Sequence, residues 1–463
     1  MLDENTTAPV PRDEEGALRA DYVEQVTQAI EAGDTDALRA LVADLHEADV
    51  GALIEALEPE QRPRLVELLG LHFDFAALTE VDDAVREEIL DELPPKTVAE
   101  GVRDLESDDA VTILESLPQD EQAQILRELP PPERVALARS LNYPESSAGR
   151  RMQDEFIAVS PQWTVGQAID YMRETAELPE RFYELYVVDD ERRFLGAVPL
   201  DRLLRSKRPI PVSELMEPER RRVHADEDQE DVARLFQRYD LVAAPVVDAN
   251  ERLVGVITFD DIADVIQQEA DEDIKALGGV THDEELSDTV WTIARGRFNW
   301  LLVNLATAFI ASSVLALFEG QLQKMVALAV LAPIVASQGG NATTQTMTVA
   351  VRALATRDLT DANAWRVILR ELMVGIVNGV AFAVITGAIA YAWFKVPGLG
   401  VVIGLAMICN LFAAALGGIL IPLGLNRLKI DPAVASSPFV TTVTDVVGFF
   451  AFLSIATVWF GLR

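Results

Sequence analysis

The chain has 463 residues, which is enough for two or three domains, and a formal net charge of −36 at pH 7. The charge is uneven, because residues 1–290 hold 28 Lys and Arg against 69 Asp and Glu, whereas residues 291–463 hold 11 against 6. The acidic part lacks the dense Lys and Arg that phosphate binding needs, so nucleic acid is excluded as the expected partner and cations are favoured. The single cysteine excludes intrachain disulfides, and the start MLDENTTAPV lacks the basic and apolar regions of a signal peptide.

Residues 1–14 are predicted to form a flexible tail and residues 15–145 a helical domain. The helical domain repeats a Leu-Pro step, in ILDELPPK, ILESLPQD and ILRELPPP. Proline disfavours helix in the residue before it and suits the first turn of a helix, so each step predicts the end of one short helix and the start of the next. The four histidines are scattered along the chain, and no catalytic cluster is evident, so neither a zinc site nor an enzyme is expected.

An internal repeat covers residues 152–266, within a domain predicted to span 146–270. Met152 and Met216 stand 64 residues apart, while YVVDDERRFLGAVPLD resembles APVVDANERLVGVITFD at an offset of 59. The first copy therefore carries five extra residues, which we place near ETAELPE. Each copy predicts the order strand, helix, strand, strand, helix. The repeat resembles a tandem pair of CBS domains, which stack into one pseudo-symmetric α/β disc.

CBS pairs often bind adenine nucleotides through the motif G-x-x-[ST]-x-x-D, in which the Asp holds the ribose hydroxyls. The second copy carries this motif in GVITFDD, as Gly255, Thr258 and Asp261. The first copy has Pro199 at the hydroxyl position and Arg202 at the Asp position. The resemblance therefore implies at most one nucleotide site, with ATP as a regulator. The alternative is a purely structural use of the turn.

Residues 271–297 are predicted to connect the soluble part to the membrane, with a helix over about 284–297 that leads into the first span. From residue 298 onward the sequence becomes apolar, and five spans are predicted over 298–318 and about 325–351, 367–394, 399–425 and 438–460. The first span has 21 residues without a charge, and at about 1.5 Å per residue it covers the roughly 30 Å of hydrocarbon. Residues 298–463 thus form a five-helix transmembrane α bundle in a multidomain protein.

The charges that flank the spans predict their direction. With the acidic half in the cytoplasm, eight Lys and Arg lie inside and only three outside, which obeys the positive-inside rule. The inner residues are Arg295, Arg297, Arg352, Arg357, Arg366, Arg370, Arg427 and Lys429, and the outer ones are Lys324, Lys395 and Arg463. We therefore expect a multi-pass protein of the inner (plasma) membrane, with cytoplasmic N-terminal domains and the C-terminus outside.

Polar residues interrupt the second span in ASQGGNATTQT, residues 336–346. Helical spacing places Asn341 and Gln345 on one face with Thr344 beside them. At about 1.5 Å per residue, the two amides lie roughly 15 and 9 Å from the inner end of the predicted span. A stretch this polar at this depth is tolerated where it faces a cavity, so it is predicted to line a water-filled path.

The fifth span contains a carboxylate, Asp445, with Thr441 on the same face. A carboxylate inside a bilayer costs at least ~2.5–3.5 kcal/mol and indicates a functional site. Mg²⁺ takes oxygen ligands and retains waters, which suits one carboxylate with hydroxyls and amides, whereas no His or Cys cluster in the spans suggests a softer metal. A two-fold dimer would place two copies of Asp445 across one axis, as in cation-selective rings. The alternative is an Asp that is protonated or bonded to an amide and only joins two helices.

The segments PIVASQGGNATTQTMTVAVRALA and DPAVASSPFVTTVTDVVGFF resemble the two signature segments of the MgtE family of magnesium channels, and the similarity covers nearly the whole chain. The resemblance implies a superhelical N-domain and a homodimer in the lipid bilayer that conducts Mg²⁺ inward. It implies that Asp445 is the main carboxylate of the pore. It also implies that Asn341, Thr344, Gln345 and Thr441 line that pore.

The same resemblance implies Mg²⁺ ions bound between soluble domains or subunits. The matching carboxylates are Asp109, Asp228, Glu230, Asp240, Asp261, Asp264, Glu269, Glu272, Asp273 and, at the inner edge of the membrane, Asp431. For each of them the alternative is a solvated surface residue. Like charges repel, so a closed dimer would need divalent ions between them, and high cytosolic Mg²⁺ would draw the connecting helix against the pore.

Three rival functions remain open. A membrane-anchored ion or nucleotide sensor would carry no flux. A CBS-gated anion channel should offer cationic or amide donors in its pore, and these spans carry Asp instead. The same architecture could also transport Co²⁺, Mn²⁺ or Ca²⁺, although retained hydration favours Mg²⁺.

Overall fold

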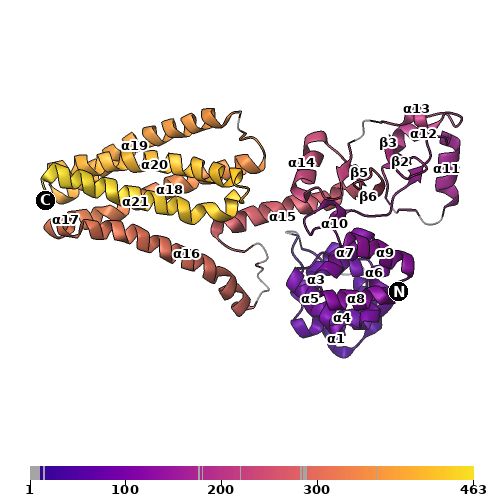
Figure 1. Cartoon of the computed structure of the whole chain (residues 1–463). Helices are drawn as coiled ribbons and strands as arrows, with labels where there is room; N and C mark the ends of the chain where they lie inside the picture. The colour runs from indigo at the N-terminus through magenta and orange to yellow at the C-terminus, as the bar shows by residue number, and fades with distance from the viewer. Residues whose placement is uncertain are drawn as a thin grey trace, which may run out of the picture. The chain divides into compact units, whose positions relative to one another are not determined.

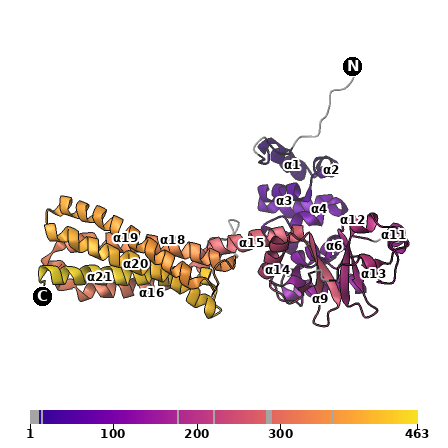
Figure 2. The same ribbon diagram turned by 90° about the horizontal axis from the view of Figure 1, so that it is seen from above.

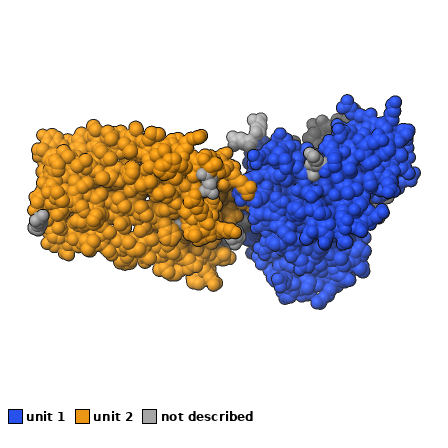
Figure 3. Space-filling view, turned by 45° about the horizontal axis from the view of Figure 1, so that its top comes forward, with its two compact units in different colours: residues 1–267 blue, residues 268–463 orange. Residues whose placement is uncertain are grey.

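A computed structural model describes residues 11–13, 16–175, 178–179, 181–218, 221–281, 284, 289–360 and 362–462, without the side chains of 434–437 (Figure 1). Most of the predicted tail lies outside the described residues. The chain divides into two compact units, residues 1–267 and 268–463, which are coloured separately in Figure 3. Each unit is described by itself below.

Short helices build the first part of unit 1 around one apolar core. They are α1 (Ala20–Ala32), α2 (Thr35–Val42), α3 (Glu47–Ala56), α4 (Arg62–Leu69), α5 (Asp83–Glu92), α6 (Pro95–Arg103), α7 (Ser107–Glu115), α8 (Gln119–Glu128) and α9 (Pro131–Ser140), with 3₁₀ turns η1 (Pro59–Gln61), η2 (Gly70–His72) and η3 (Phe75–Leu78).

The Leu-Pro steps end and start helices, as predicted. Leu93 lies between α5 and α6, Leu117 between α7 and α8, and Leu129 between α8 and α9. All three leucines are buried in the core of this domain. Each step therefore combines a proline that begins the next helix with a leucine that fixes the turn against the core.

The second part of unit 1 contains two three-stranded sheets of the same topology. The first copy consists of α10 (Ala148–Arg151), β1 (Ala158–Val159), α11 (Val165–Glu174), β2 (Glu184–Val188), β3 (Phe194–Pro199), α12 (Leu200–Leu204) and α13 (Val212–Leu215). The second consists of β4 (Val223–His224), α14 (Gln229–Tyr239), β5 (Ala243–Val247), β6 (Leu253–Thr258) and α15 (Phe259–Gly278). In each sheet the first two strands are parallel and the last two antiparallel.

The predicted repeat is confirmed. The helix that follows the first strand of each copy begins at 165 in α11 and at 229 in α14, an offset of 64. The last two strands begin at 184 and 243, and at 194 and 253, an offset of 59. The five extra residues therefore lie between α11 and β2, in the stretch that contains ETAELPE, part of which is outside the described residues. The bridges Gln153–Val256 and Ala197–Glu217 show that the segment before each copy pairs with a strand of the other copy.

The connecting segment agrees in part with the prediction, because residues 290–297 are helical and lead directly into the first span. Helix α15 continues without a break from the second CBS copy through residue 278, and it ends where Gly279 adopts a left-handed φ of +73°. The described residues between 279 and 289 are not helical, residues 285–288 of the expected helix lie outside the described part, and the next helix begins at Val290 with Thr289 as its cap. Helix α15 thus extends beyond residue 270, the predicted end of the CBS pair, and the helix that leads into the first span begins at residue 290.

Five helices of unit 2 are long and apolar enough to cross a membrane, as predicted. They are α16 (Val290–Leu317), α18 (Val326–Ala355), α19 (Ala364–Phe394), α20 (Pro397–Arg427) and α21 (Pro432–Phe460), with the short α17 (Glu319–Lys324) between the first two. Helix α20 is the centre of the bundle, because it packs against α18, α19 and α21, while α16 packs on α21 (Figure 2).

The end of α15 belongs to this second unit. Ala276 is buried with Met347 of α18 and with Ala433 and Val440 of α21. The helix that enters unit 2 from the second CBS copy therefore packs on α18 and α21, which carry the polar residues singled out in the sequence.

Candidate ion pathway and carboxylate pairs

A polar strip runs along the exposed side of α18. Asn341, Thr344 and Thr348 are exposed, whereas Thr343 and Met347 face the interior of the bundle. The hydroxyl of Thr344 donates to the carbonyl of Gly340 at 3.0 Å, and that of Thr348 donates to the carbonyl of Thr344 at 2.9 Å. Because these hydroxyls give their protons to the helix, their remaining lone pairs are acceptors that suit a cation or its waters.

Asp445 lies half-buried on α21, and Thr441 is exposed one turn earlier on the same face. Thr444, buried beside them, donates its hydroxyl to the carbonyl of Thr441 at 2.9 Å. Within the described part of the chain, the Asp445 carboxylate has no recorded hydrogen bond or ion pair. A carboxylate that joined two helices through an amide would have such a bond, so this chain alone gives no support to the structural alternative.

Gln345 is exposed, as are Asn341 and Thr344 of the polar strip. It lies at the edge of the strip and lines a cavity toward α19 and α20 together with Thr346. The reason is the packing of α18, which turns residues 342, 345, 346 and 349 toward that cavity and 343 and 347 toward the bundle interior.

Asn410 on α20 is a buried amide that the sequence analysis missed. It is 0 % exposed, and its Nδ2 donates to the carbonyl of Val335 on α18 at 2.7 Å. Its Oδ1 is buried without a hydrogen-bond partner among the described residues. Gly339 of α18 and Gly448 of α21 both lie against this side chain. Asn410 therefore joins the two helices that carry the polar residues, and a lone Asn in an otherwise apolar span was the available signal.

We expect the two adjacent glycines of α18 to differ sharply when mutated to alanine. A Cβ at Gly339 would lie 2.1 Å from Asn410 Nδ2, whereas a Cβ at Gly340 would have nothing within 4 Å. Gly339→Ala should therefore lower the unfolding temperature through overpacking of about 1–3 kcal/mol, and Gly340→Ala should leave it nearly unchanged. Thermal unfolding of the two purified variants in detergent measures this, and equal unfolding temperatures would contradict the packing described.

Two of the predicted carboxylates meet in unit 1. The charge of Asp261 on α15 acts on Asp109 of α7, and Asp108, which is 7 % exposed, hydrogen-bonds to Asp261. Burial raises the pKa of Asp109 to about 7, helped by the charges of Asp261 and Glu106. Burial also raises the pKa of Asp261 to about 6, although the bond from Thr258 opposes it. The sequence analysis missed Asp108, because acidic residues are common in the first turn of a helix and do not by themselves indicate a site.

More acids surround this group. Burial raises the pKa of Asp108 well above its ordinary range, with the charges of Asp261 and Asp109 as further causes, so Asp108 is the carboxyl that holds the proton it shares with Asp261. Asp264, exposed on α15, helps burial to raise the pKa of Glu80. This concentration of negative charge is unfavourable without cations.

Three other predicted ligands lie apart from this group. Asp228 caps α14 by accepting from the Glu230 amide at 2.9 Å, and Glu230 pairs with Arg234 at 2.7 Å. Asp240 ends the same helix in a left-handed conformation with φ +50°. Because Asp228 and Asp240 flank the 11 residues of α14, they stand roughly 18 Å apart along its axis. Within one chain they do not form a site.

A second pair forms in unit 2. Asp273 near the end of α15 faces Asp431, which caps α21 by accepting from the Ala433 amide at 2.8 Å. Burial and the charge of Asp431 raise the pKa of Asp273, while Arg352 opposes them. Glu269 and Glu272 are half-buried on the same helix. Among the described residues no group of three or more His, Cys, Asp or Glu could hold a metal by itself, so an ion here would need water or a second chain to complete its ligands.

The nucleotide motif is used internally in this conformation. The Thr258 hydroxyl donates to Asp261 Oδ2 at 2.7 Å, and a Cβ at Gly255 would lie 2.6 Å from Met152 Sδ. Gly196 of the first copy lies against Met216 in the same way. Both glycines are therefore required for the packing of one CBS copy on the other, and a ribose would have to compete with Thr258 for Asp261.

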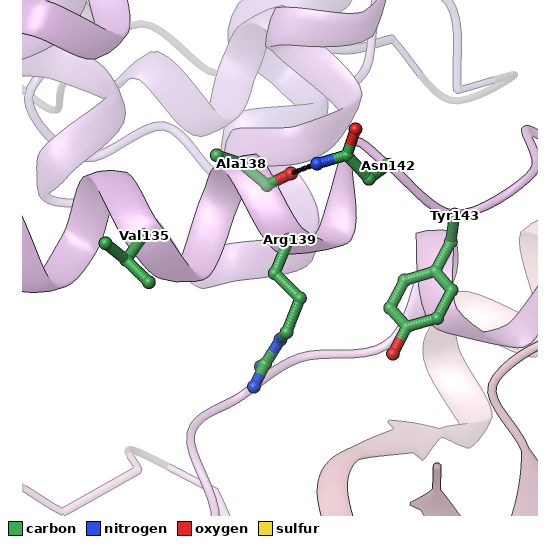
Figure 4. A pocket seen from close by; sticks show the side chains of 5 residues that line it. All are labelled: Val135, Ala138, Arg139, Asn142 and Tyr143. Atoms are coloured by element: carbon green, nitrogen blue, oxygen red, sulfur yellow. Dashed lines mark hydrogen bonds between the residues drawn. The ribbon is translucent and has the colours of Figure 1, made fainter. Parts of the chain in front are cut away.

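The hollow shown in Figure 4 has a different character. It measures about 460 Å³ and is lined by Val135, Ala138, Arg139, Asn142 and Tyr143. Asn142 donates to the Ala138 carbonyl at 2.6 Å, and Arg139 donates to the Val254 carbonyl at 3.1 Å. This lining contains no carboxylate, so it offers little to a divalent cation.

The raised pKa values of Asp109 and Asp261 predict how pH affects the metal-free protein. Both exceed the ordinary value of 3.8, so the folded state binds more protons than the unfolded state between about pH 4 and 7. This stabilisation is complete below pH 4 and is lost as pH rises through 6 to 7. We expect the unfolding temperature in EDTA to fall between pH 5 and 8, and to fall less in Asp109→Asn. Asp120→Asn, an exposed acid on α8, is the control, and an equal pH response in wild type and Asp109→Asn would contradict the assignment.

Comparisons with known proteins agree with this architecture. The divalent cation transporter family MgtE matches residues 332–455, the MgtE intracellular N domain matches 45–146, and the CBS domain matches 148–208 and 212–268. The magnesium transporter MgtE of Thermus thermophilus is 36 % identical over 449 residues, covering 93 % of this chain and 96 % of the relative. That of Enterococcus faecalis is 36 % identical over 313 residues, covering 68 % and 69 %.

Among solved structures, the cytosolic domain of the Mg²⁺ channel MgtE in complex with ATP is similar to this chain. It has 33 % identity and a TM-score of 0.48, and the match covers 52 % of this chain and 99 % of that one.

Proposed function

Because the chain belongs to the MgtE family of divalent cation transporters, we propose that it is a homodimeric magnesium channel whose pore is lined by α18 and α21. Its relatives are named magnesium transporters over most of their length, and its five spans make it a membrane protein. Mg²⁺ is its cargo. The flanking charges favour an orientation with the soluble part in the cytoplasm, and entry of Mg²⁺ into the cytoplasm is the direction that we propose for the flux.

The observation that carries the proposal is the Asp445 carboxylate. It is half-buried on a spanning helix and has no recorded protein partner in the described part of the chain. An unpaired carboxylate in hydrocarbon has an unfavourable free energy, and binding of a divalent cation would offset it. Thr441 on the same helix and Asn341 and Thr344 on α18 supply oxygens, with which a partly hydrated Mg²⁺ is compatible.

We expect a second copy of the chain to pack against the polar strip of α18. Asn341, Thr344 and Thr348 are exposed in the single chain, and lipid would leave their polar atoms unsatisfied. A two-fold axis beside α18 and α21 would turn the strip toward its own copy and enclose a path for the ion.

The carboxylate pairs suit a gate that responds to the transported ion. In unit 1, the charge of Asp261 helps to raise the pKa of Asp109, and in unit 2 Asp273 faces Asp431 beside α18 and α21. Mg²⁺ between such groups would stabilise the arrangement in which they meet, and its loss would let them separate. High cytosolic Mg²⁺ would therefore close the pore through α15, whose last turns pack on α18 and α21.

ATP remains a prediction for Gly255, Thr258 and Asp261. Since Asp261 would serve both the ribose and a bridging Mg²⁺, nucleotide and Mg²⁺ should compete at this residue. The bond between Thr258 and Asp261 would have to break for the nucleotide to bind.

Ion flux from loaded vesicles tests the proposal. Proteoliposomes are filled with isotopically enriched Mg²⁺ and placed in a bath without Mg²⁺, so molecules whose soluble part faces the bath release the isotope in the inward direction. We expect release that slows as unlabelled Mg²⁺ is added to the bath. The same vesicles filled with Co²⁺, Mn²⁺ or Ca²⁺ measure selectivity. Absence of release under every condition would favour the sensor without flux.

A further inference from the structure

A second cavity, with several polar residues in its lining, opens on the side of the membrane bundle between α18, α19 and α20, and its residues Gln345 and Asn378 are exposed in the single chain. It measures about 190 Å³, which leaves room for several waters at the roughly 30 Å³ that each occupies in the liquid. Its polar lining consists of Gln345 and Thr346 from α18 and Glu371 and Asn378 from α19. A carboxylate, two amides and a hydroxyl thus converge at a place where the neighbouring side chains are apolar.

The packing of α19 on α20 explains why these groups share one face. A Cβ at Gly375 would lie 2.8 Å from Ala415 Cβ and 3.0 Å from the Leu411 carbonyl, so only glycine permits this approach. Glu371 and Asn378 stand four residues before and three residues after Gly375, which places them on the same side of α19. Both side chains therefore line the cavity together with Gln345 and Thr346 of α18.

The protein itself leaves these groups largely unused. Within the described residues, the side chains of Gln345, Thr346 and Asn378 have no recorded hydrogen bond. Glu371 is 15 % exposed, and its one recorded partner is the adjacent Arg370, which contacts only Oε1, at 3.2 and 3.3 Å. Polar groups without protein partners in a spanning segment require a polar occupant.

We propose that this cavity binds a second divalent cation that keeps its water shell, with Glu371 as the charged ligand and Gln345, Thr346 and Asn378 as acceptors of hydrogen bonds from its waters. The inference rests on the proposed function as a magnesium channel. Mg²⁺ gives up water reluctantly, so contact through water suits one carboxylate and three neutral groups. Glu371 is seven residues from the start of α19, roughly 10 Å along the helix from its cytoplasmic end. The site therefore lies on the inner side of the bundle and would hold ions near their exit.

A structural experiment uses hexaamminecobalt(III), whose inert ammonia shell imitates the water shell of Mg²⁺. The full-length protein is crystallised with this probe, and the anomalous X-ray scattering of cobalt locates the bound complex. Signal in the cavity of the wild type and its absence in Glu371→Gln support the proposal. An empty cavity, or density for a lipid chain in it, overturns the proposal.

A functional experiment uses two variants that break the same ion pair. Glu371→Gln removes the charge that attracts the cation, so it should raise the half-saturating luminal Mg²⁺ concentration for release roughly fivefold, which corresponds to ~1 kcal/mol. Arg370→Gln frees Oε1 of Glu371 and removes a nearby positive charge, so it should lower that concentration. Glu371→Asp should restore most of the wild-type behaviour.

The two variants separate a cation site from a structural ion pair. If Glu371 served only to hold Arg370, both glutamine variants would change release in the same direction, and the proposal would be wrong. Wild-type vesicles that release no Mg²⁺ at all would instead count against the channel function. In that case cobalt in the cavity would still decide whether the cation site exists.

Discussion

Asp445→Asn is expected to abolish Mg²⁺ release from loaded vesicles. The substitution keeps the size of the side chain and removes the negative charge that attracts the divalent cation. In a region of low dielectric, the interaction energy between two charges is much larger than in water. A loss of about 100-fold in release corresponds to ~2.7 kcal/mol. Losing the charge interaction is expected to cost at least this much, so release should fall below the detection limit of the assay. The measurement is isotope release in a Mg²⁺-free bath.

Two variants control this result. Glu319→Gln removes a charge from α17, outside the predicted pathway, and should release Mg²⁺ like the wild type. Asp445→Glu keeps the charge but moves it by one methylene, so it should retain partial release. Gel filtration and thermal unfolding must show that Asp445→Asn is folded and has the same oligomeric state. Undiminished release by a folded Asp445→Asn would place the pathway elsewhere.

Asp109→Lys is expected to close the channel in the absence of Mg²⁺. A lysine at position 109 would lie near the acids whose negative charge now raises the pKa of Asp109, which are Asp261, Glu106, Glu47 and Glu80. It would thus take the place of the bridging cation and stabilise the closed arrangement. Release into a Mg²⁺-free bath should fall at least about tenfold, the effect of ~1.4 kcal/mol on a two-state equilibrium.

The double variant reverses the expectation. Asp109→Lys with Asp261→Lys places two positive charges together, which repel each other and bind no Mg²⁺, so release should be high and insensitive to bath Mg²⁺. Asp120→Lys makes the same charge change on the exposed side of α8 and should behave like the wild type. If Asp109→Lys stays fully open in a Mg²⁺-free bath, then Asp109 does not take part in closure.

Much of the architecture follows from local signals. The Leu-Pro steps predict the helix ends of the first domain because proline acts on its own neighbours. The CBS repeat is visible because two copies of one fold need the same apolar pattern, and the offsets of 64 and 59 reappear in the helices and strands. The five spans follow from length and hydropathy alone.

The continuity of α15 could not be predicted in the same way. Its acidic stretch QEADEDI contains few apolar residues, and such a stretch indicates a boundary between domains rather than the interior of a packed helix. The helix persists because Ala276 and its neighbours pack against Met347 and Val440, which are distant in the sequence. Gly279 then ends it with a left-handed φ.

The sequence by itself determined the chemistry of this protein: its polar residues in α18, the carboxylate in α21 and the acidic soluble half. Residue type and helical period depend only on neighbours along the chain. Only the tertiary structure decided which of these groups meet. It brought Asp109 near Asp261 and Asp273 near Asp431, and it left Asp228 and Asp240 at opposite ends of one helix. It also placed Gln345 and Glu371 in the lining of one cavity. Such pairings depend on contacts like that of Gly375 with Ala415, which the spacing within one helix does not encode.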